Sequence, residues 1–270
     1  MSHHAALRRL ALGLGLAMAA CTAEPTSLTI LQMQPLDSDC VPVQDSQLAV
    51  ARGVVDIALA TSYVAFPLAR NNMVDIVNAR SFQARDGRIK SHDVLLREAV
   101  VDYTTLDPIT ATLPQRRVIP LSGTIQINTQ VALGVELLDP GMVQAIRQSP
   151  EFLVIDSQDQ ARPIRTQVTM VAKITLRGNL PDGSEIESNE LRFPIQICNG
   201  CRVTYPPEAI DDAAGRTPNC LALNLADETR EAPVCPAFIG TDDRFVDCRD
   251  CQGFAVDSLA RQLCQPPAGL

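Results

Sequence analysis

Apolar and polar residues alternate most clearly between positions 167 and 198. Every second residue from 168 to 176 is apolar, which is typical of a strand with one buried face. Residues 178–183 (GNLPDG) have the glycine, proline and aspartate of a turn, and 191–198 (LRFPIQIC) alternates again as a predicted return strand. Pro194 has no N–H to donate, so we expect this second strand at a sheet edge or beside a bulge.

Similar patterns predict more strands upstream, at 27–33, 47–60, 62–69, 74–79 and 89–104. Asp86-Gly87 predicts a turn, and the interruption at Arg97-Glu98 predicts a bulge. The alternation from 119 to 137 is too long for one typical strand, so we expect a bend near Gly123 or a break near Thr129. Residues 129–138 could instead form a helix.

Asp139-Pro140 has the N-cap and first-turn residues of a short helix, with Met142, Val143 and Ile146 facing the core. Eight or nine strands without alternating helices predict an antiparallel sheet. We therefore expect a mainly β fold, with an immunoglobulin-like β-sandwich over residues 26–200.

The pattern becomes irregular in residues 201–270, which we call the Cys-rich tail. Prolines, aspartates and closely spaced cysteines predict loops packed on the sandwich. Residues 253–263 predict one short helix with Phe254, Leu259 and Leu263 directed inward.

Composition excludes several function classes. A hydrophobic content of 46% is too high for a disordered chain, and an aromatic content of 4% gives few platforms for stacking sugars or bases. The net charge of −8, without a basic stripe, argues against nucleic-acid binding.

Residues 1–20 have the order of a secretory signal: Arg8 and Arg9, then an apolar run too short to span a bilayer, then small residues. Met18-Ala19-Ala20-Cys21 resembles the lipobox of bacterial lipoproteins. That resemblance implies cleavage before Cys21, lipid on its thiol and a tether over residues 21–25; an ordinary signal peptide with a chance cysteine is the alternative. Thr22, where inner-membrane lipoproteins tend to have Asp, favours the outer membrane by the same resemblance.

The sequence has nine cysteines, and assigning Cys21 to lipid leaves an even number. In an oxidising compartment we expect these to form disulfides. Seven cluster near the end of the chain, so Cys40 must pair with a cysteine at or beyond Cys198 if all pair within the chain. The disulfide candidates are Cys40, Cys198, Cys201, Cys220, Cys235, Cys248, Cys251 and Cys264.

Two Cys-x-x-Cys pairs leave an alternative open. Cys198, Cys201, Cys248 and Cys251 could supply the four thiolates of a tetrahedral zinc site. A redox pair is a further possibility, although Cys198 ends a strand-like run rather than beginning a helix.

No catalytic set is evident, and we expect no cofactor. His92 is the one histidine after the signal, and the sequence has no Gly-x-Ser-x-Gly elbow for a hydrolase nucleophile. The acidic clusters at Asp37/Asp39, Asp211/Asp212 and Asp242/Asp243/Asp247 lack the spacing of a calcium loop and predict solvated loop charge.

The whole chain after the signal also resembles predicted Cys-rich lipoproteins of myxobacteria and related bacteria. The resemblance lies in the lipobox, in 191–198 (LRFPIQIC) and in the following Asn199-Gly200-Cys201. It implies no activity. We therefore expect a lipid-anchored, non-enzymatic protein of the cell envelope with a protein partner there, and the alternative is a metal or thiol-redox protein.

Overall fold

The computed structural model describes residues 27–74, 92–152, 167–209, 218–224, 235–256 and 258–264. The predicted signal, Cys21, most of the strand predicted at 74–79 and the Asp86-Gly87 turn lie outside these residues. In the part that is described, no helix is both long enough and apolar enough to cross a membrane.

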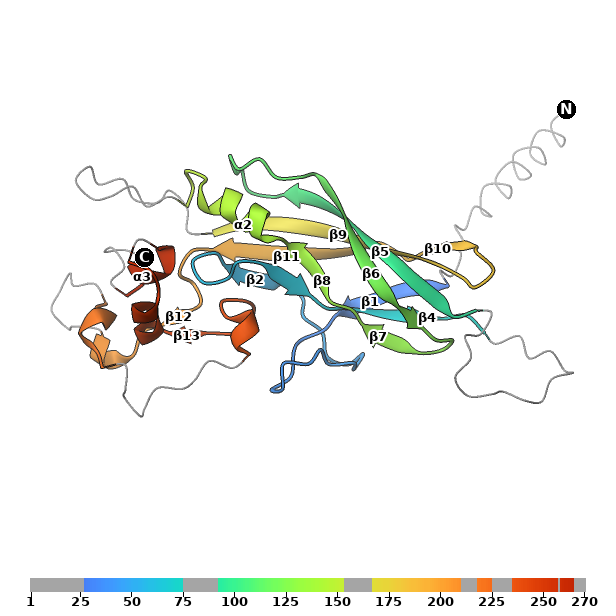
Figure 1. Ribbon diagram of the computed structural model, residues 1–270, viewed down its shortest axis with the longest axis horizontal. Helices are drawn as coiled ribbons and strands as arrows, with labels where there is room; N and C mark the ends of the chain where they lie inside the picture. Colours follow the sequence, from blue (N-terminus) through green and yellow to red (C-terminus); the bar gives the residue numbers. More distant parts are fainter. Residues whose placement is uncertain are drawn as a thin grey trace, which may run out of the picture.

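The main sheet curls into a half-barrel (Figure 1). β9 lies near its middle, and every inward residue of β9 from Val168 to Leu176 is fully buried, as the alternation predicts. The strands in spatial order are β2 (Gly53–Asp56), β11 (Leu191–Cys198), β9 (Gln167–Asn179), β5 (Val94–Thr105) and β6 (Arg116–Ile125), with β10 (Glu185–Glu187) beside β9.

Shorter elements cover the inner face of the half-barrel. One sheet has the order β1 (Leu28–Met33), β4 (Pro67–Asn71) and β7 (Gln130–Ala132), and a second pairs β3 (Tyr63–Ala65) with β8 (Val135–Leu138). The helix α2 (Pro140–Arg147) follows β8. Residues from all these elements join the inward side chains of the main sheet in one apolar core, whose burial is the main stabilising contribution.

Several local predictions are confirmed. Helix α2 begins after Asp139, whose Oδ1 accepts a hydrogen bond from the N–H of Met142 at 2.8 Å. The β5 register shifts between Leu96 and Glu98, at the predicted bulge. The long alternation breaks after Ile125, so that β7 and β8 are separate strands and the helical alternative is wrong.

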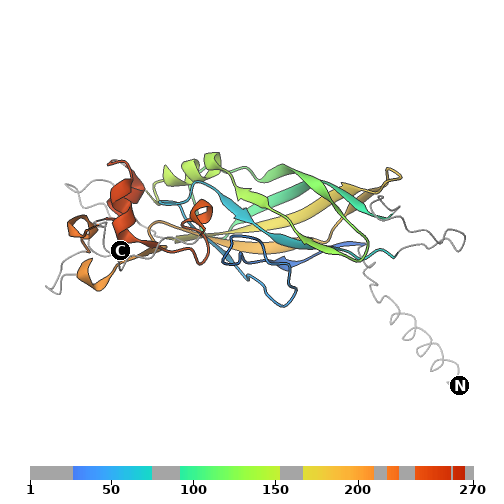
Figure 2. The same ribbon diagram turned by 60° about the horizontal axis from the view of Figure 1, so that its bottom comes forward.

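The mainly β fold is confirmed, but the all-antiparallel arrangement is not. β2 pairs with β11 in parallel, so the main sheet is mixed rather than antiparallel. Its curl gives a half-barrel that is not clearly an immunoglobulin-like sandwich (Figures 1 and 2). Of the strand predicted at 47–60, the structure has the four residues of β2, because the chain turns away after Asp56.

Pro194 is placed on an internal strand, contrary to the prediction of an edge. β2 contacts β11 only from Ile195 to Cys198, so the side of Pro194 that lacks an N–H adjoins no partner from β2. Pro194 pairs with Val171 of β9 without a register shift. The strand therefore tolerates proline because its second neighbour begins one residue later.

The Cys-rich tail lies at one end of the long axis, and the turn between β9 and β10 lies at the other (Figures 1 and 2). Its small core consists of Ala209 and four buried cysteines. Phe254 is 38% exposed, against the inward position predicted. The tail elements are β12 (Val203–Thr204), η1 (Pro207–Ala209), η2 (Cys220–Ala222), η3 (Pro236–Phe238), β13 (Val246–Asp247), η4 (Cys248–Gly253) and α3 (Leu259–Gln262).

Candidate functional site

The Cys198–Cys201 disulfide lies where β11 leaves the half-barrel and the tail begins. Alternation along β11 brings Ile195 and Ile197 into the core, and Cys198 is fully buried at its end. The chain then turns through Gly200, whose φ of +82° favours glycine. Cys201 is part-exposed after this turn, so the disulfide joins a buried cysteine to a part-exposed one.

The Asp56 carboxylate, fully buried at the end of β2, holds this turn in place. Its Oδ1 accepts hydrogen bonds from the N–H groups of Ala58 at 3.0 Å and Gly200 at 2.8 Å. Its Oδ2 accepts from the N–H of Arg202 at 2.9 Å. Burial raises the pKa of Asp56 above its usual value, although the three N–H donors act in the opposite direction.

Other ionisable side chains surround Asp56. Arg147, in the last turn of α2, donates to the carbonyl oxygens of Ile57 and Ala60. Burial lowers the pKa of Arg147, and the negative charge of Asp56 partly offsets this. Burial together with the Asp56 charge raises the pKa of Tyr205 to about 12. The loop after β2 is therefore held by charged groups bonded to backbone atoms.

Asp56, Cys198 and Cys201 are the one set of three potential metal ligands found among the described residues, with ligand atoms within 4.8 Å of one another. A bonded disulfide sulfur lacks the thiolate charge that metals require. Both Asp56 oxygens already accept backbone hydrogen bonds. In this oxidised form the three residues do not fit a metal ion.

The four cysteines of the predicted zinc alternative are not brought together. Cys198 and Cys201 bond to each other, whereas Cys248 bonds to Cys220 and Cys251 to Cys264. The Cys220–Cys248 disulfide links η2 to η4, and Cys251–Cys264 links η4 to the residues that follow α3.

Cys40 pairs with Cys235, 195 residues away, which confirms that its partner lies beyond Cys198. Their Cα atoms are 5.4 Å apart, within the ordinary range for a disulfide. This bridge ties the loop between β1 and β2 to the Cys-rich tail.

Asp242 forms a second, part-buried anchor between tail and half-barrel. Its Oδ1 accepts from the N–H of Val54 at 2.9 Å and from the Tyr63 hydroxyl at 3.0 Å. Its own N–H donates to the Val54 carbonyl oxygen at 2.8 Å, which covers the outer edge of β2. Burial raises the pKa of Asp242, and the pKa of Tyr63 rises well above its usual value through burial and the neighbouring carboxylate.

The remaining candidate residues do not assemble into one site. Nδ1 of His92 lies 2.8 Å from the carbonyl oxygen of Val74. Asp37 accepts from the N–H groups of Asp39 and Val41, as in an Asx turn. Asp247 forms an ion pair with Arg249, with 2.6 Å between its Oδ2 and Nη2 of the arginine. Asp211 and Asp212 lie outside the described residues.

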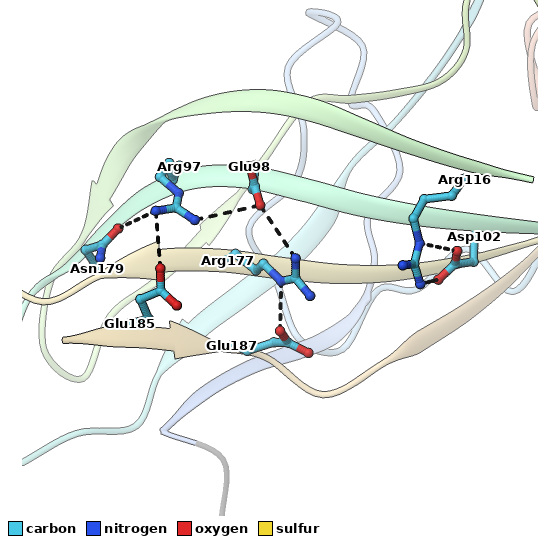
Figure 3. A network of polar contacts seen from close by, with 8 residues as sticks. All are labelled: Arg97, Glu98, Asp102, Arg116, Arg177, Asn179, Glu185 and Glu187. Atoms are coloured by element: carbon cyan, nitrogen blue, oxygen red, sulfur yellow. Dashed lines mark hydrogen bonds and ion pairs between the residues drawn. The ribbon is translucent and has the colours of Figure 1, made fainter. Parts of the chain in front are cut away.

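The outward face of β5, β6, β9 and β10 carries a network of ion pairs (Figure 3). Arg177 lies between Glu187 at 2.8 Å and Glu98 at 3.7 Å. Arg116 donates to both oxygens of Asp102, at 2.6 and 2.8 Å. Exposed pairs of this kind contribute little stability, but they engage these seven charged side chains with one another.

One shallow pocket of about 260 Å³ lies between residues 59–64 and the region from Pro236 to Thr241. Its volume is below the usual range for small-molecule sites, and no charged side chain lines it. We therefore assign no ligand to it.

Asp56 is the residue of the site that the sequence analysis missed. The signal was present, because Asp56 interrupts the apolar run 53–60 (GVVDIALA), and a charge inside a buried run needs hydrogen-bonding partners. The structure describes eight of the nine cysteines, and Cys21 lies outside the described residues. No family model, curated protein or solved structure matches this chain.

Proposed function

We propose that this chain is an exported lipoprotein, held to the outer membrane by lipid on Cys21. In this proposal its β half-barrel is a non-enzymatic structural or binding module. The observation that carries the proposal is the pairing of eight cysteines in four disulfides. Disulfides persist outside the cytosol, and they indicate an extracytoplasmic protein. Since these eight pair among themselves, Cys21 is left for other chemistry.

The way in which charged groups are used supports a binding module over an enzyme. Asp56 and Asp242 accept hydrogen bonds from backbone N–H groups, and Arg147 donates to backbone carbonyls. The charges on the outward face of the sheet pair with one another (Figure 3). These groups stabilise the fold, which leaves loops and the edge strand β6 as the surfaces offered to a protein partner. We further propose that the half-barrel is a strongly curled variant of an immunoglobulin-like sandwich.

Lipid attachment is tested by producing the full chain in a Gram-negative bacterium with radiolabelled palmitate. The unchanged chain should incorporate label, lose its signal and sediment with membranes, because two or three acyl chains give durable anchoring. Cys21→Ser should incorporate no label. Thr22→Ser, a matched change at the next residue, should behave as the unchanged chain does.

An unlabelled, uncleaved chain in the soluble fraction would contradict the anchoring proposal. The non-enzymatic part has its own test: a hydrolase activity that disappears in His92→Ala would overturn it, whatever the result with palmitate.

A further inference from the structure

The two sulfurs of the Cys198–Cys201 disulfide differ in access. Cys198 is 0% exposed, whereas Cys201 is part-exposed. By contrast, Cys220–Cys248 and Cys251–Cys264 each join two buried residues, none more than 3% exposed. Thiol–disulfide exchange requires that a thiolate reach one sulfur along the S–S axis. Of the four bridges, Cys198–Cys201 and Cys40–Cys235 each join a part-exposed cysteine to a buried one. Only in Cys198–Cys201 are the two cysteines three residues apart, within a single turn.

The backbone around this bridge is fixed by contacts that do not involve the S–S bond. The Cys198 carbonyl accepts from the N–H of Ile57 at 2.8 Å. The residues on either side of Cys201, Gly200 and Arg202, donate their N–H groups to Asp56 at 2.8 and 2.9 Å. Since none of these bonds involves a sulfur atom, we expect them to keep the two sulfurs close enough to rejoin after the bridge opens.

We propose that Cys198–Cys201 is a thiol–disulfide exchange site for a small, low-molecular-weight thiol, with Cys201 as the sulfur attacked. The small thiolate bonds to Sγ of Cys201, the S–S bond breaks, and Sγ of Cys198 takes its electron pair. A second small thiolate then attacks the small-molecule sulfur of the mixed disulfide. This releases the oxidised small disulfide and leaves Cys201 as a thiolate.

The net reaction oxidises two small thiols to one disulfide and reduces the bridge to two protein thiols, which receive the two protons. The small disulfide reverses the sequence. Sγ of Cys198 lies 3.6 Å from the Val55 carbonyl oxygen, which can accept the new S–H. Asp56 is the nearest acid, with Arg147, Arg202 and Tyr205 as the ionisable groups around it.

Leu263 restricts the size of the thiol. A Cβ on Gly200 would lie 2.7 Å from Cδ2 of Leu263, so this side chain packs closely over the turn. The Leu263 carbonyl is fixed by the Tyr205 hydroxyl at 3.0 Å. A slender thiol can reach Cys201 beside Leu263 more readily than a folded protein can.

The first test treats the native full chain with dithiothreitol, stops the reaction with an alkylating reagent and maps the labelled peptides by mass spectrometry. Cys198 and Cys201 should be labelled at least ~10-fold faster than the buried pair Cys251 and Cys264. Oxidised glutathione should then restore the bridge. Equal rates, or labelling only after the chain unfolds, would overturn the proposal.

The second test compares Cys198→Ser with Cys201→Ser, a matched pair that each leaves one thiol. With a chromogenic small disulfide, free Cys201 should react about 10-fold faster than free Cys198. Equal or reversed rates would refute Cys201 as the attacked sulfur, and if either variant fails to fold, the dithiothreitol experiment decides. Reaction with a protein dithiol that is faster than with dithiothreitol would refute the size assignment. These outcomes do not depend on whether Cys21 carries lipid.

Discussion

Asp56 is a buried carboxylate and Asp242 a part-buried one, and their hydrogen-bond donors are mainly backbone N–H groups. Such donors stabilise the charged form, but for both residues burial is the larger effect and raises the pKa. A carboxyl with a raised folded pKa favours folding most when it is protonated. These two contacts between half-barrel and tail therefore become less favourable as the pH rises.

Asp242→Asn isolates one of these carboxyls, because the amide keeps an acceptor oxygen and does not titrate. The stability of the unchanged chain minus that of the variant should be largest below the unfolded pKa of 3.8. It should decline as the pH rises through the raised folded pKa. Urea denaturation of both proteins between pH 3 and about 8 measures this difference.

Asp182→Asn is the control with the opposite sign. Hydrogen bonds from Ser184 lower the pKa of the exposed Asp182. The stability of the unchanged chain minus that of Asp182→Asn should be fully present above pH 3.8. It should be lost as the pH falls through the lowered folded pKa of Asp182. If the stability difference changed with pH in the same direction for both variants, the burial of Asp242 would not be what governs its titration.

At the scale of elements, α2 depends on a single capping side chain. Asp139 accepts from the N–H of Met142 at 2.8 Å and lies 3.0 Å from Arg117 of β6. Asp139→Ala should lower the free energy of unfolding by about 1 kcal/mol, because it removes the N-cap bond. Thermal or urea denaturation measures the loss.

Glu136→Ala removes the other acidic neighbour of Arg117, a part-exposed residue at 3.9 Å, and should cost less than about 0.5 kcal/mol. If the two variants lose equal stability, the ion pairs of Arg117 rather than the N-cap explain the effect.

The sequence predicted those elements whose cause is local. Alternation in β9 and β11, the Asp139 cap and the bulge before Glu98 each depend on a few consecutive residues. The parallel pairing of β2 with β11 was missed, because a strand of only four residues (GVVD) carries no information about its partner. The curl of the sheet was missed for the same reason.

The candidate site also combines features with a local cause, which the sequence predicts, and contacts between distant residues, which it does not. Cys40 had to pair beyond Cys198, since the other candidate cysteines all lie there. The individual pairings and the contact of Asp56 with Gly200 needed three dimensions, because residues 144 positions apart meet there. Phe254 is exposed because α3 begins only at Leu259, later than the pattern indicated.

At the scale of the whole molecule, Cys40–Cys235 closes the longest covalent loop. The double variant Cys40→Ala/Cys235→Ala should lower the free energy of unfolding by about 5 kcal/mol in the chain-entropy model. Ser46→Ala, an exposed change in the same loop, should alter it by less than about 0.5 kcal/mol. Denaturation under non-reducing conditions compares them, and a loss of only ~1 kcal/mol for the double variant would contradict the chain-entropy estimate for this loop.

The long axis separates the start of the described chain from the Cys-rich tail. Leu28 bridges to Ser188 beside β10, whereas β11 runs from there to Cys198 at the tail. If Cys21 carries lipid as proposed, the half-barrel would be attached to the bilayer through the end of the molecule at which β1 begins. β9 alone, at 13 residues, spans roughly 40 Å, about the thickness of a lipid membrane. The sulfur-rich end would then project about one bilayer's depth from the lipid surface, within reach of molecules that never touch the membrane.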